Sequence, residues 1–311
     1  MTTLPTAAPR PHKMSKMQRR EARAGLLFVL PWLLGLLIFT GYPVLATVFL
    51  AFTDYSVLEA PRWTGLQNFQ TMFGGDPSFG ISVYNSTYYA LISVPLGLAV
   101  ALGLAVVLNQ RARGVGIYRT LFYLPSLVPP VAATLVFLVM FEPKGGVINT
   151  LLRSVGLPGP AWFYDPAWSK PGLILISLWA VGAATLIFLA GLQDIPQSLL
   201  DAAAIDGASS PQRFRHVTLP LLTPVILFNL VMGIIYSFQV FVQAIVIGGA
   251  TGRPLESTLM FMVLIYRSAF RYFQMGYASA LSLVLFIVVF GLTVLIFKTS
   301  RRWVFYSGGE E

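Results

Sequence analysis

Uncharged polar residues recur along one apolar stretch of the chain, and their types suit the recognition of a small polar solute. Asn, Gln, Ser and Tyr can hydrogen-bond to hydroxyl groups, and a tyrosine ring can stack on the C–H face of a sugar. At 100° per residue, these positions fall within about 80° either side of one line along a helix. Such groups also bond neighbouring helices in a bundle, so the pattern leaves both uses open. The residues are Asn229, Gly233, Tyr236, Ser237, Gln239 and Gln243.

Residue sets for covalent, metal or phosphate chemistry are missing from the sequence. There is no cysteine, and the two histidines, His12 and His216, lie far apart in the chain. This excludes a thiolate nucleophile and a Cys/His zinc site. The Gly-Lys dipeptide of a phosphate-binding loop does not occur either. We therefore expect that the chain is not an enzyme and binds no cofactor, and that any work against a gradient draws its energy from another polypeptide.

The stretch that carries the polar residues is one of six long runs without Asp, Glu, Lys or Arg. Of the 311 residues, 56% are hydrophobic and 11% are charged, whereas an average soluble domain is about 25% charged. Each run reaches the roughly 20 residues that a helix needs to cross about 30 Å of hydrocarbon. The runs are 25–53, 77–110, 120–141, 171–193, 216–252 and 272–297. The sequence therefore predicts an all-α polytopic membrane protein with six transmembrane helices.

The basic residues predict how these helices are oriented. With six spans, fourteen Lys and Arg fall on the side of the two termini, and seven fall on the other side, together with six acids. Because cytoplasmic loops carry the excess of Lys and Arg, both termini are expected in the cytoplasm. The net charge of +9 is then a consequence of topology, and not a sign of nucleic-acid binding.

The loop between the fourth and fifth runs has the sequence of two short helices joined by a turn. Ala202 and its neighbours are strong helix formers, and Gly207 can take the left-handed conformation that ends a helix. Ser209 or Ser210 can cap the next helix, with Pro211 in its first turn. A cytoplasmic helix-turn-helix of this kind is a suitable shape for a groove on another protein.

This loop resembles the hallmark of the integral-membrane permease subunits of binding-protein-dependent ABC importers. The hallmark is Glu-Ala-Ala, three residues, Gly, nine residues, Ile, one residue and Leu-Pro. Asp201-Ala202-Ala203, Gly207 and Val217-x-Leu219-Pro220 match it, with Asp201 in place of Glu and Val217 in place of Ile. The segment 63–69 looks like the one after the first span in carbohydrate permeases, and 276–280 looks like the start of their last span. The ending 301–306 looks like the maltose, lactose and glycerol-phosphate first-permease type.

The resemblance implies a fold, a set of partners and a place in the cell. The fold would be that of a type I ABC importer permease in the plasma membrane of a bacterium or archaeon. The partners would be a second permease, two cytosolic ATPase subunits that use ATP and Mg²⁺, and an extracytoplasmic solute-binding protein. The ATPase would contact the loop through Asp201, Ala202, Ala203, Asp206, Gly207, Val217, Leu219 and Pro220.

The same resemblance implies a path for a sugar or sugar-like solute. Trp179, near the level where family members hold sugar, would add a stacking surface to the polar residues of the fifth run. A stand-alone secondary carrier or channel for a neutral solute is the alternative. That class usually shows an inverted repeat or an intramembrane charge, and neither is clear here.

The chain accordingly divides into three parts. Residues 1–24 form a basic cytoplasmic tail, expected to be partly disordered, and residues 25–298 form the six-helix permease domain. Within that domain, residues 194–220 are the coupling loop. Residues 299–311 form a cytoplasmic C-terminal tail.

Overall fold

The structure, a computed structural model, describes residues 16–110 and 113–305. Most of these residues are helical, which confirms the predicted all-α class. Residues 16–24 of the predicted tail belong to a helix, whereas the disorder expected for residues 1–15 lies outside the described residues. Two units make up the chain, Met1–Phe49 and Leu50–Glu311. The first contains α1 (Lys16–Leu36), a π-helical segment η1 (Leu37–Gly41) and most of α2 (Tyr42–Leu50).

Four helical segments are long and apolar enough to cross a membrane, or up to six if each of two bent pairs is one span. The first runs from α1 through α2. The other three are α4 (Pro77–Leu108), α13 (Thr223–Phe238) continued by α14 (Val242–Gly248), and α16 (Met275–Ser300). The bent pairs are α5 (Val115–Tyr123) with α6 (Pro130–Met140), and α8 (Pro166–Trp179) with α9 (Gly182–Gln193). Each segment overlaps one of the six predicted uncharged runs.

The two bends have different causes. Between α5 and α6 the chain turns by 97°, through a 3₁₀ segment η2 (Leu124–Leu127). Pro129 and Pro130 follow that segment, and neither has an N–H to continue a helix. Between α8 and α9 the turn is 49°. There, Gly182 lies so close to the backbone of Phe122 that a Cβ on it would be 2.4 Å from the Phe122 carbonyl oxygen.

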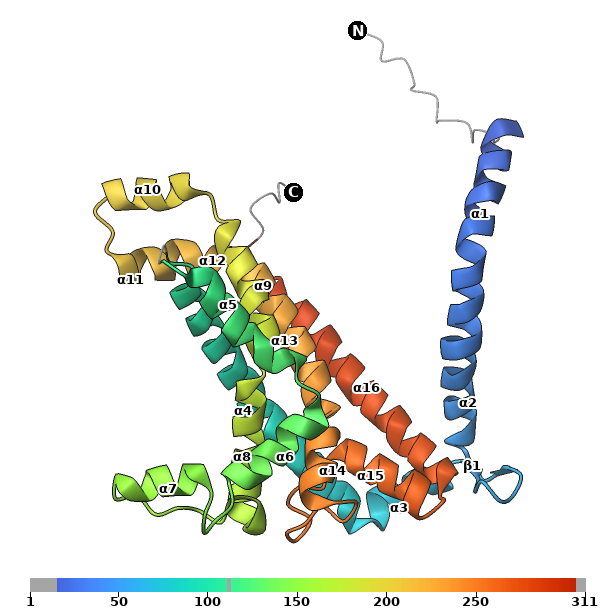
Figure 1. Cartoon of the computed structure of the whole chain (residues 1–311). Helices are drawn as coiled ribbons and strands as arrows, with labels where there is room; N and C mark the ends of the chain where they lie inside the picture. Colours follow the sequence, from blue (N-terminus) through green and yellow to red (C-terminus); the bar gives the residue numbers. More distant parts are fainter. Residues whose placement is uncertain (1–15, 111–112, 306–311) are drawn as a thin grey trace. The chain divides into compact units, whose positions relative to one another are not determined.

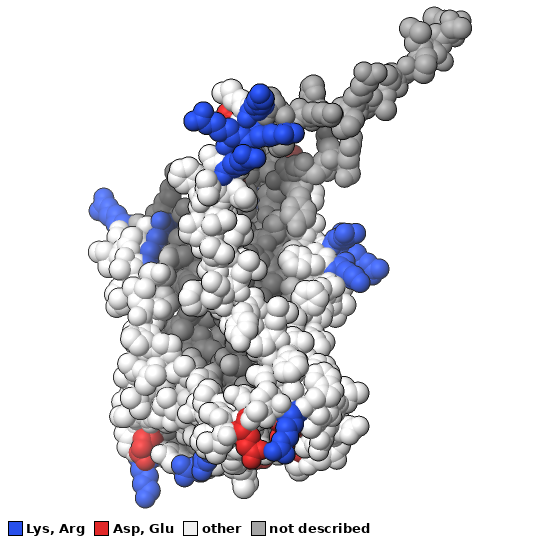
Figure 2. All heavy atoms as spheres, turned by 90° about the vertical axis from the view of Figure 1, so that its right-hand side faces the viewer, with Lys and Arg blue, Asp and Glu red and all other residues white. Residues whose placement is uncertain are grey.

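Shorter elements lie in the connections. In the Leu50–Glu311 unit, α10 and α11 lie at one end, and α3, α7 and α15 at the opposite end (Figure 1). Figure 2 shows acidic and basic atoms gathered together at the lower end, below broad uncharged surface. The bounds are β1 (Thr53–Asp54), β2 (Arg62–Trp63), α3 (Gln67–Gly74), α7 (Val147–Ser154), η3 (Trp162–Tyr164), α10 (Gln197–Ile205), α11 (Ser210–Arg213), η4 (Phe214–Thr218), α12 (Leu219–Leu221), α15 (Phe261–Tyr266) and η5 (Arg267–Arg271). Strands β1 and β2 pair antiparallel, with Thr53 opposite Trp63.

Small residues allow α4 to pack closely against the other long helices. Ala101 and Ala105 are both fully buried, in one cluster with Phe188 and Leu189 of α9. Since lipid is as apolar as leucine, close van der Waals contact across small residues is a main source of helix association in a membrane. This packing fixes α4, α9 and α13 around a shared space.

We expect Gly276→Ala to destabilise the fold, because Gly276 lies against the backbone of β1. A Cβ there would be 2.0 Å from the Thr53 carbonyl oxygen. Overpacking of this kind costs about 1–3 kcal/mol. The thermal unfolding midpoint of the purified full-length protein in detergent should fall. Gly291→Ala is the control in the same helix, since nothing lies within 4 Å of its Cβ position. An unchanged midpoint for Gly276→Ala would contradict this contact.

Candidate functional site

The loop between α9 and α13 forms the predicted pair of short helices. Helix α10 ends at Ile205, and Gly207 follows it with a φ of 81°, the left-handed conformation that the sequence predicts. The Ala208 N–H donates to the Ala203 carbonyl oxygen at 2.9 Å, and the Gly207 N–H donates to that of Ala204 at 3.1 Å. These two bonds are the Schellman motif, in which a left-handed residue satisfies the last carbonyls of a helix. The turn between α10 and α11 is thus set by one glycine.

A capping box begins α11. The Gln212 Oε1 atom accepts a hydrogen bond from the Ser209 backbone N–H at 2.7 Å, and the Ser209 side chain caps the helix in return. Reciprocal capping satisfies N–H groups that a helix start would leave without partners. A cap at both sides of the turn gives the loop a defined shape where it projects from the helices (Figure 1).

The motif residues of this loop divide into an exposed half and an anchored half. Asp201, Ala202, Asp206 and Gly207 are exposed, and the neighbouring Ile205 is 86% exposed. The other four, Ala203, Val217, Leu219 and Pro220, are half-buried. The Gln197 Nε2 donates to Asp201 Oδ1 at 2.9 Å, which orients that carboxylate. The exposed half is therefore available to a partner, and the anchored half connects it to α13.

A cavity of about 690 Å³ lies between α4, α8, α9 and the α13–α14 segment. All six predicted polar positions of the fifth run line it: Asn229, Gly233, Tyr236, Ser237, Gln239 and Gln243. Among the residues that the structure describes, none of those that line it is charged. The volume falls in the range of small-molecule sites, about 300–1,000 Å³.

Hydrogen bonding separates these polar residues into two groups. The Asn229 side chain donates to the Val225 carbonyl oxygen at 3.0 Å, and the Ser237 hydroxyl donates to that of Ile234 at 2.9 Å. Both are almost fully buried and satisfied by their own helix. Tyr236, Gln239 and Gln243 have no side-chain hydrogen bond within the described part of the chain, and Tyr236 is 63% exposed. These three side chains are the ones free to bind a solute.

The segment formed by α13 and α14 is interrupted where it lines the cavity. The sequence did not predict this interruption. Helix α13 ends at Phe238 and α14 begins at Val242, so residues 239–241 are not helical. All three line the cavity. In a membrane protein, non-helical backbone is tolerated where it lines a cavity or is buried in protein. The break therefore brings backbone groups as well as side chains to this space.

Three further polar residues line the cavity and were missed from the sequence. Tyr89 and Ser93 lie on α4, one turn apart, and Ser177 lies on α8. The spacing of four between the first two was the available signal. Trp179 lies outside the lining, is 40% exposed, and packs edge-on against Phe137 with ring centroids 5.4 Å apart. The structure thus brings six of the seven predicted path residues together and leaves Trp179 apart from them.

Residues 93–301 match the family described as "Binding-protein-dependent transport system inner membrane component". This match includes the α10–α11 loop and most of the cavity. The probable ABC transporter permease protein YesP of Bacillus subtilis is 45% identical over 300 residues, covering 96% of this chain and 97% of that protein. The trehalose/maltose transport system permease protein MalF of Thermococcus litoralis is 32% identical, covering 92% and 97%. The lactose transport system permease protein LacF of Rhizobium radiobacter is 33% identical, covering 93% and 97%.

A solved structure has the same fold. It is the crystal structure of a bacterial ABC transporter involved in the import of the acidic polysaccharide alginate. One of its chains superposes with a TM-score of 0.81 at 24% sequence identity, covering 93% of this chain and 99% of that chain. The described helices therefore have the arrangement of a chain in an ABC importer.

Proposed function

The chain belongs to the binding-protein-dependent transport system inner membrane components, and we propose that it forms the path of an ABC importer for a sugar or sugar-like solute. It has the type I ABC importer permease fold and lies in the plasma membrane. The observation that carries the substrate class is the uncharged cavity, where Tyr236, Gln239 and Gln243 have unused hydrogen-bonding groups. Relatives named for trehalose, maltose and lactose transport agree with it.

The exposed half of the α10–α11 loop is where we place the contact with an ATPase subunit. Asp201, Asp206 and Gly207 lie on this exposed surface, and the capped turn gives it a fixed shape. The loop is joined through η4 and α12 to α13, which lines the cavity. A displacement of the loop on ATP binding would therefore reach the cavity through one continuous segment.

The complex that we propose has a second permease, two cytosolic ATPase subunits and an extracytoplasmic binding protein. This chain would bind no cofactor and catalyse no reaction, and ATP with Mg²⁺ would be used by the ATPase subunits. The test is to purify the tagged chain from its native host, identify the proteins that accompany it, and measure uptake of trehalose, maltose and lactose in reconstituted vesicles. ATP-dependent uptake of one of them, which stops when the ATPase subunits are omitted, is expected. Uptake by this chain alone would instead support a stand-alone carrier or channel.

Six spans with both termini in the cytoplasm would put the α10–α11 loop inside and the α14–α15 connection outside. Since the sequence has no cysteine, single cysteines can report the side. Ile205→Cys and Leu255→Cys form a matched pair, as each residue is 86% exposed. A membrane-impermeant maleimide added to intact cells should label Leu255→Cys and leave Ile205→Cys unlabelled, and inverted vesicles should reverse the pattern. Labelling of Ile205→Cys from outside would contradict this orientation.

A further inference from the structure

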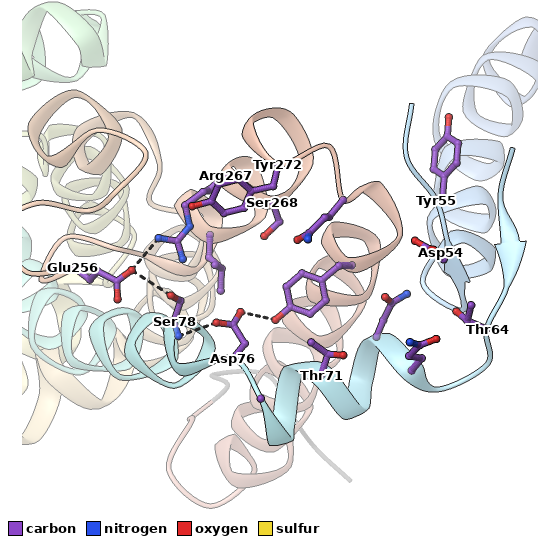
Figure 3. A pocket seen from close by; sticks show the side chains of 16 residues that line it. Asp54, Tyr55, Thr64, Thr71, Asp76, Ser78, Glu256, Arg267, Ser268 and Tyr272 are labelled. Atoms are coloured by element: carbon purple, nitrogen blue, oxygen red, sulfur yellow. Dashed lines mark hydrogen bonds and ion pairs between the residues drawn. The ribbon is translucent and has the colours of Figure 1, made fainter. Parts of the chain in front are cut away.

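A second cavity lies in the Leu50–Glu311 unit, at the end opposite the α10–α11 loop. Its volume is about 640 Å³, and it is formed by β1, α3, the start of α4, the segment around Glu256, η5 and the start of α16 (Figure 3). It shares no lining residue with the cavity beside α13. Under the proposed topology, it opens on the outer side of the membrane.

One set of lining residues forms a fixed frame. The Asp76 carboxylate accepts hydrogen bonds from the Tyr277 hydroxyl at 2.7 Å and the Ser78 backbone N–H at 2.9 Å. Glu256 accepts from Arg267 at 2.9 Å and from the Ser78 hydroxyl at 3.2 Å. Figure 3 shows these bonds joining η5, the Glu256 segment and the start of α4. Because these elements come from distant parts of the sequence, their bonds hold the cavity in a defined shape.

The remaining polar lining residues have unused hydrogen-bonding capacity. The side chains of Asp54, Gln67 and Gln274 are exposed and have no hydrogen bond in the residues that the structure describes. Arg267 is only 6% exposed and is bonded to Glu256, so it belongs to the frame. The exposed side chains are therefore the ones that a ligand in the cavity could contact.

The charges and residue types indicate the class of ligand. Three carboxylates and one guanidinium line the cavity, which disfavours an anion. The described residues contain no group of three His, Cys, Asp or Glu that could hold a metal ion. Two amides, a free carboxylate and the rings of Tyr55 and Tyr272 remain. These groups match alternating hydroxyls and C–H faces, which are features of an uncharged saccharide.

We propose that this cavity is a second saccharide-binding site, separate from the transport path beside α13. Its ligand is an uncharged mono- or disaccharide, a class that rests on the proposed function. Asp54, Gln67 and Gln274 hydrogen-bond to the sugar hydroxyls.

The test measures equilibrium binding of radiolabelled trehalose, maltose and lactose to the full complex in lipid nanodiscs, without the binding protein. Gln67→Ala, Gln274→Ala and Asp54→Asn should each weaken the binding of one of these sugars at least fivefold. Gln70→Ala is the matched control, because Gln70 is exposed on the same helix as Gln67 and does not line the cavity. Each variant is also measured in the Tyr236→Ala background, where the other cavity contributes little, and Gln67→Ala should weaken the binding that remains there.

Three results would overturn the proposal. Binding that Tyr236→Ala removes and Gln67→Ala retains would assign the sugar to the cavity beside α13. If the complex binds no sugar at this cavity, and Gln67→Ala and Gln274→Ala instead weaken its binding of the solute-binding protein, the cavity would be a protein-docking surface. A complex that takes up sugar normally with ATP, and whose sugar binding none of these variants weakens, would contradict the second site. The proposed function would then still stand.

Discussion

Gly207→Val is expected to abolish solute-stimulated ATP hydrolysis while the complex still inserts in the membrane. Gly207 has a φ of 81°, and the two hydrogen bonds that end α10 depend on that conformation. A non-glycine residue costs about 1–2 kcal/mol in the left-handed region, and a β-branched residue is a strong outlier there. The valine would shift the turn between α10 and α11 and so move the exposed half of the loop. Since about 1.4 kcal/mol changes an equilibrium constant tenfold, the solute-stimulated rate of ATP hydrolysis should fall at least tenfold.

The control for this variant is Gly207→Asn. Asparagine adopts the left-handed conformation more readily than other non-glycine residues, so this variant should keep most of the stimulated activity. Steric clashes do not affect the comparison, because nothing lies within 4 Å of the Cβ position of Gly207. Membrane content, measured by immunoblot, should be equal for both variants. Equal stimulation of the valine and asparagine variants would refute a role for the turn in coupling.

Features of the fold that depend on neighbouring residues in the sequence were predictable. The positions of the membrane segments follow from the lengths of the uncharged runs, because crossing a bilayer requires about 20 apolar residues in a row. The end of α10 before Gly207 and the cap of α11 at Ser209 follow from single residues with strong local preferences. The bend before α6 also has a local cause, because Pro129 and Pro130 have no N–H to continue a helix.

Features that arise from contacts across space were not predictable from the sequence. At the bend between α8 and α9, Gly182 lies against the backbone of Phe122, sixty positions earlier in the chain. The break at residues 239–241 contains neither proline nor glycine. Trp179 lies two residues after Ser177, yet Ser177 lines the cavity and Trp179 does not. Trp179 is the last residue of α8 and lies on another side of the helix from Ser177, where it packs against Phe137.

Helical periodicity placed five polar residues and Gly233 on one face, but it could not distinguish the side chains that are free from those already hydrogen-bonded to their own helix. Asn229 and Tyr236 are seven positions apart on α13, about two turns, and both line the cavity. Their roles are separated by the hydrogen bond from Asn229 to the Val225 carbonyl oxygen and by burial, since Asn229 is 6% exposed and Tyr236 is 63% exposed. A substitution experiment on this helix therefore needs variants from both groups.

Tyr236→Ala should reduce sugar uptake at least tenfold, and Gln243→Ala should reduce it by a smaller factor. Tyr236 lines the cavity and is 63% exposed, and its hydroxyl has no hydrogen bond within the described residues. A hydrogen bond contributes about 0.5–1.5 kcal/mol, and a stacking contact about as much again. The two together are worth about 1–3 kcal/mol, with a midpoint of about 2 kcal/mol, and 1.4 kcal/mol corresponds to tenfold. Tyr236→Phe separates the two contributions, since it keeps the ring and should lose only the hydrogen bond.

The controls for Tyr236 lie on the same helix. Ile235→Ala changes the adjacent residue, which does not line the cavity, and should leave uptake close to that of the unmodified protein. Asn229→Ala removes a cavity residue whose amide is already bonded to its own helix, so its effect should come through stability and not through solute affinity. Initial uptake rates over a range of sugar concentrations separate these cases. Uptake by Tyr236→Ala equal to that of Ile235→Ala would mean that the polar residues of α13 serve helix packing alone.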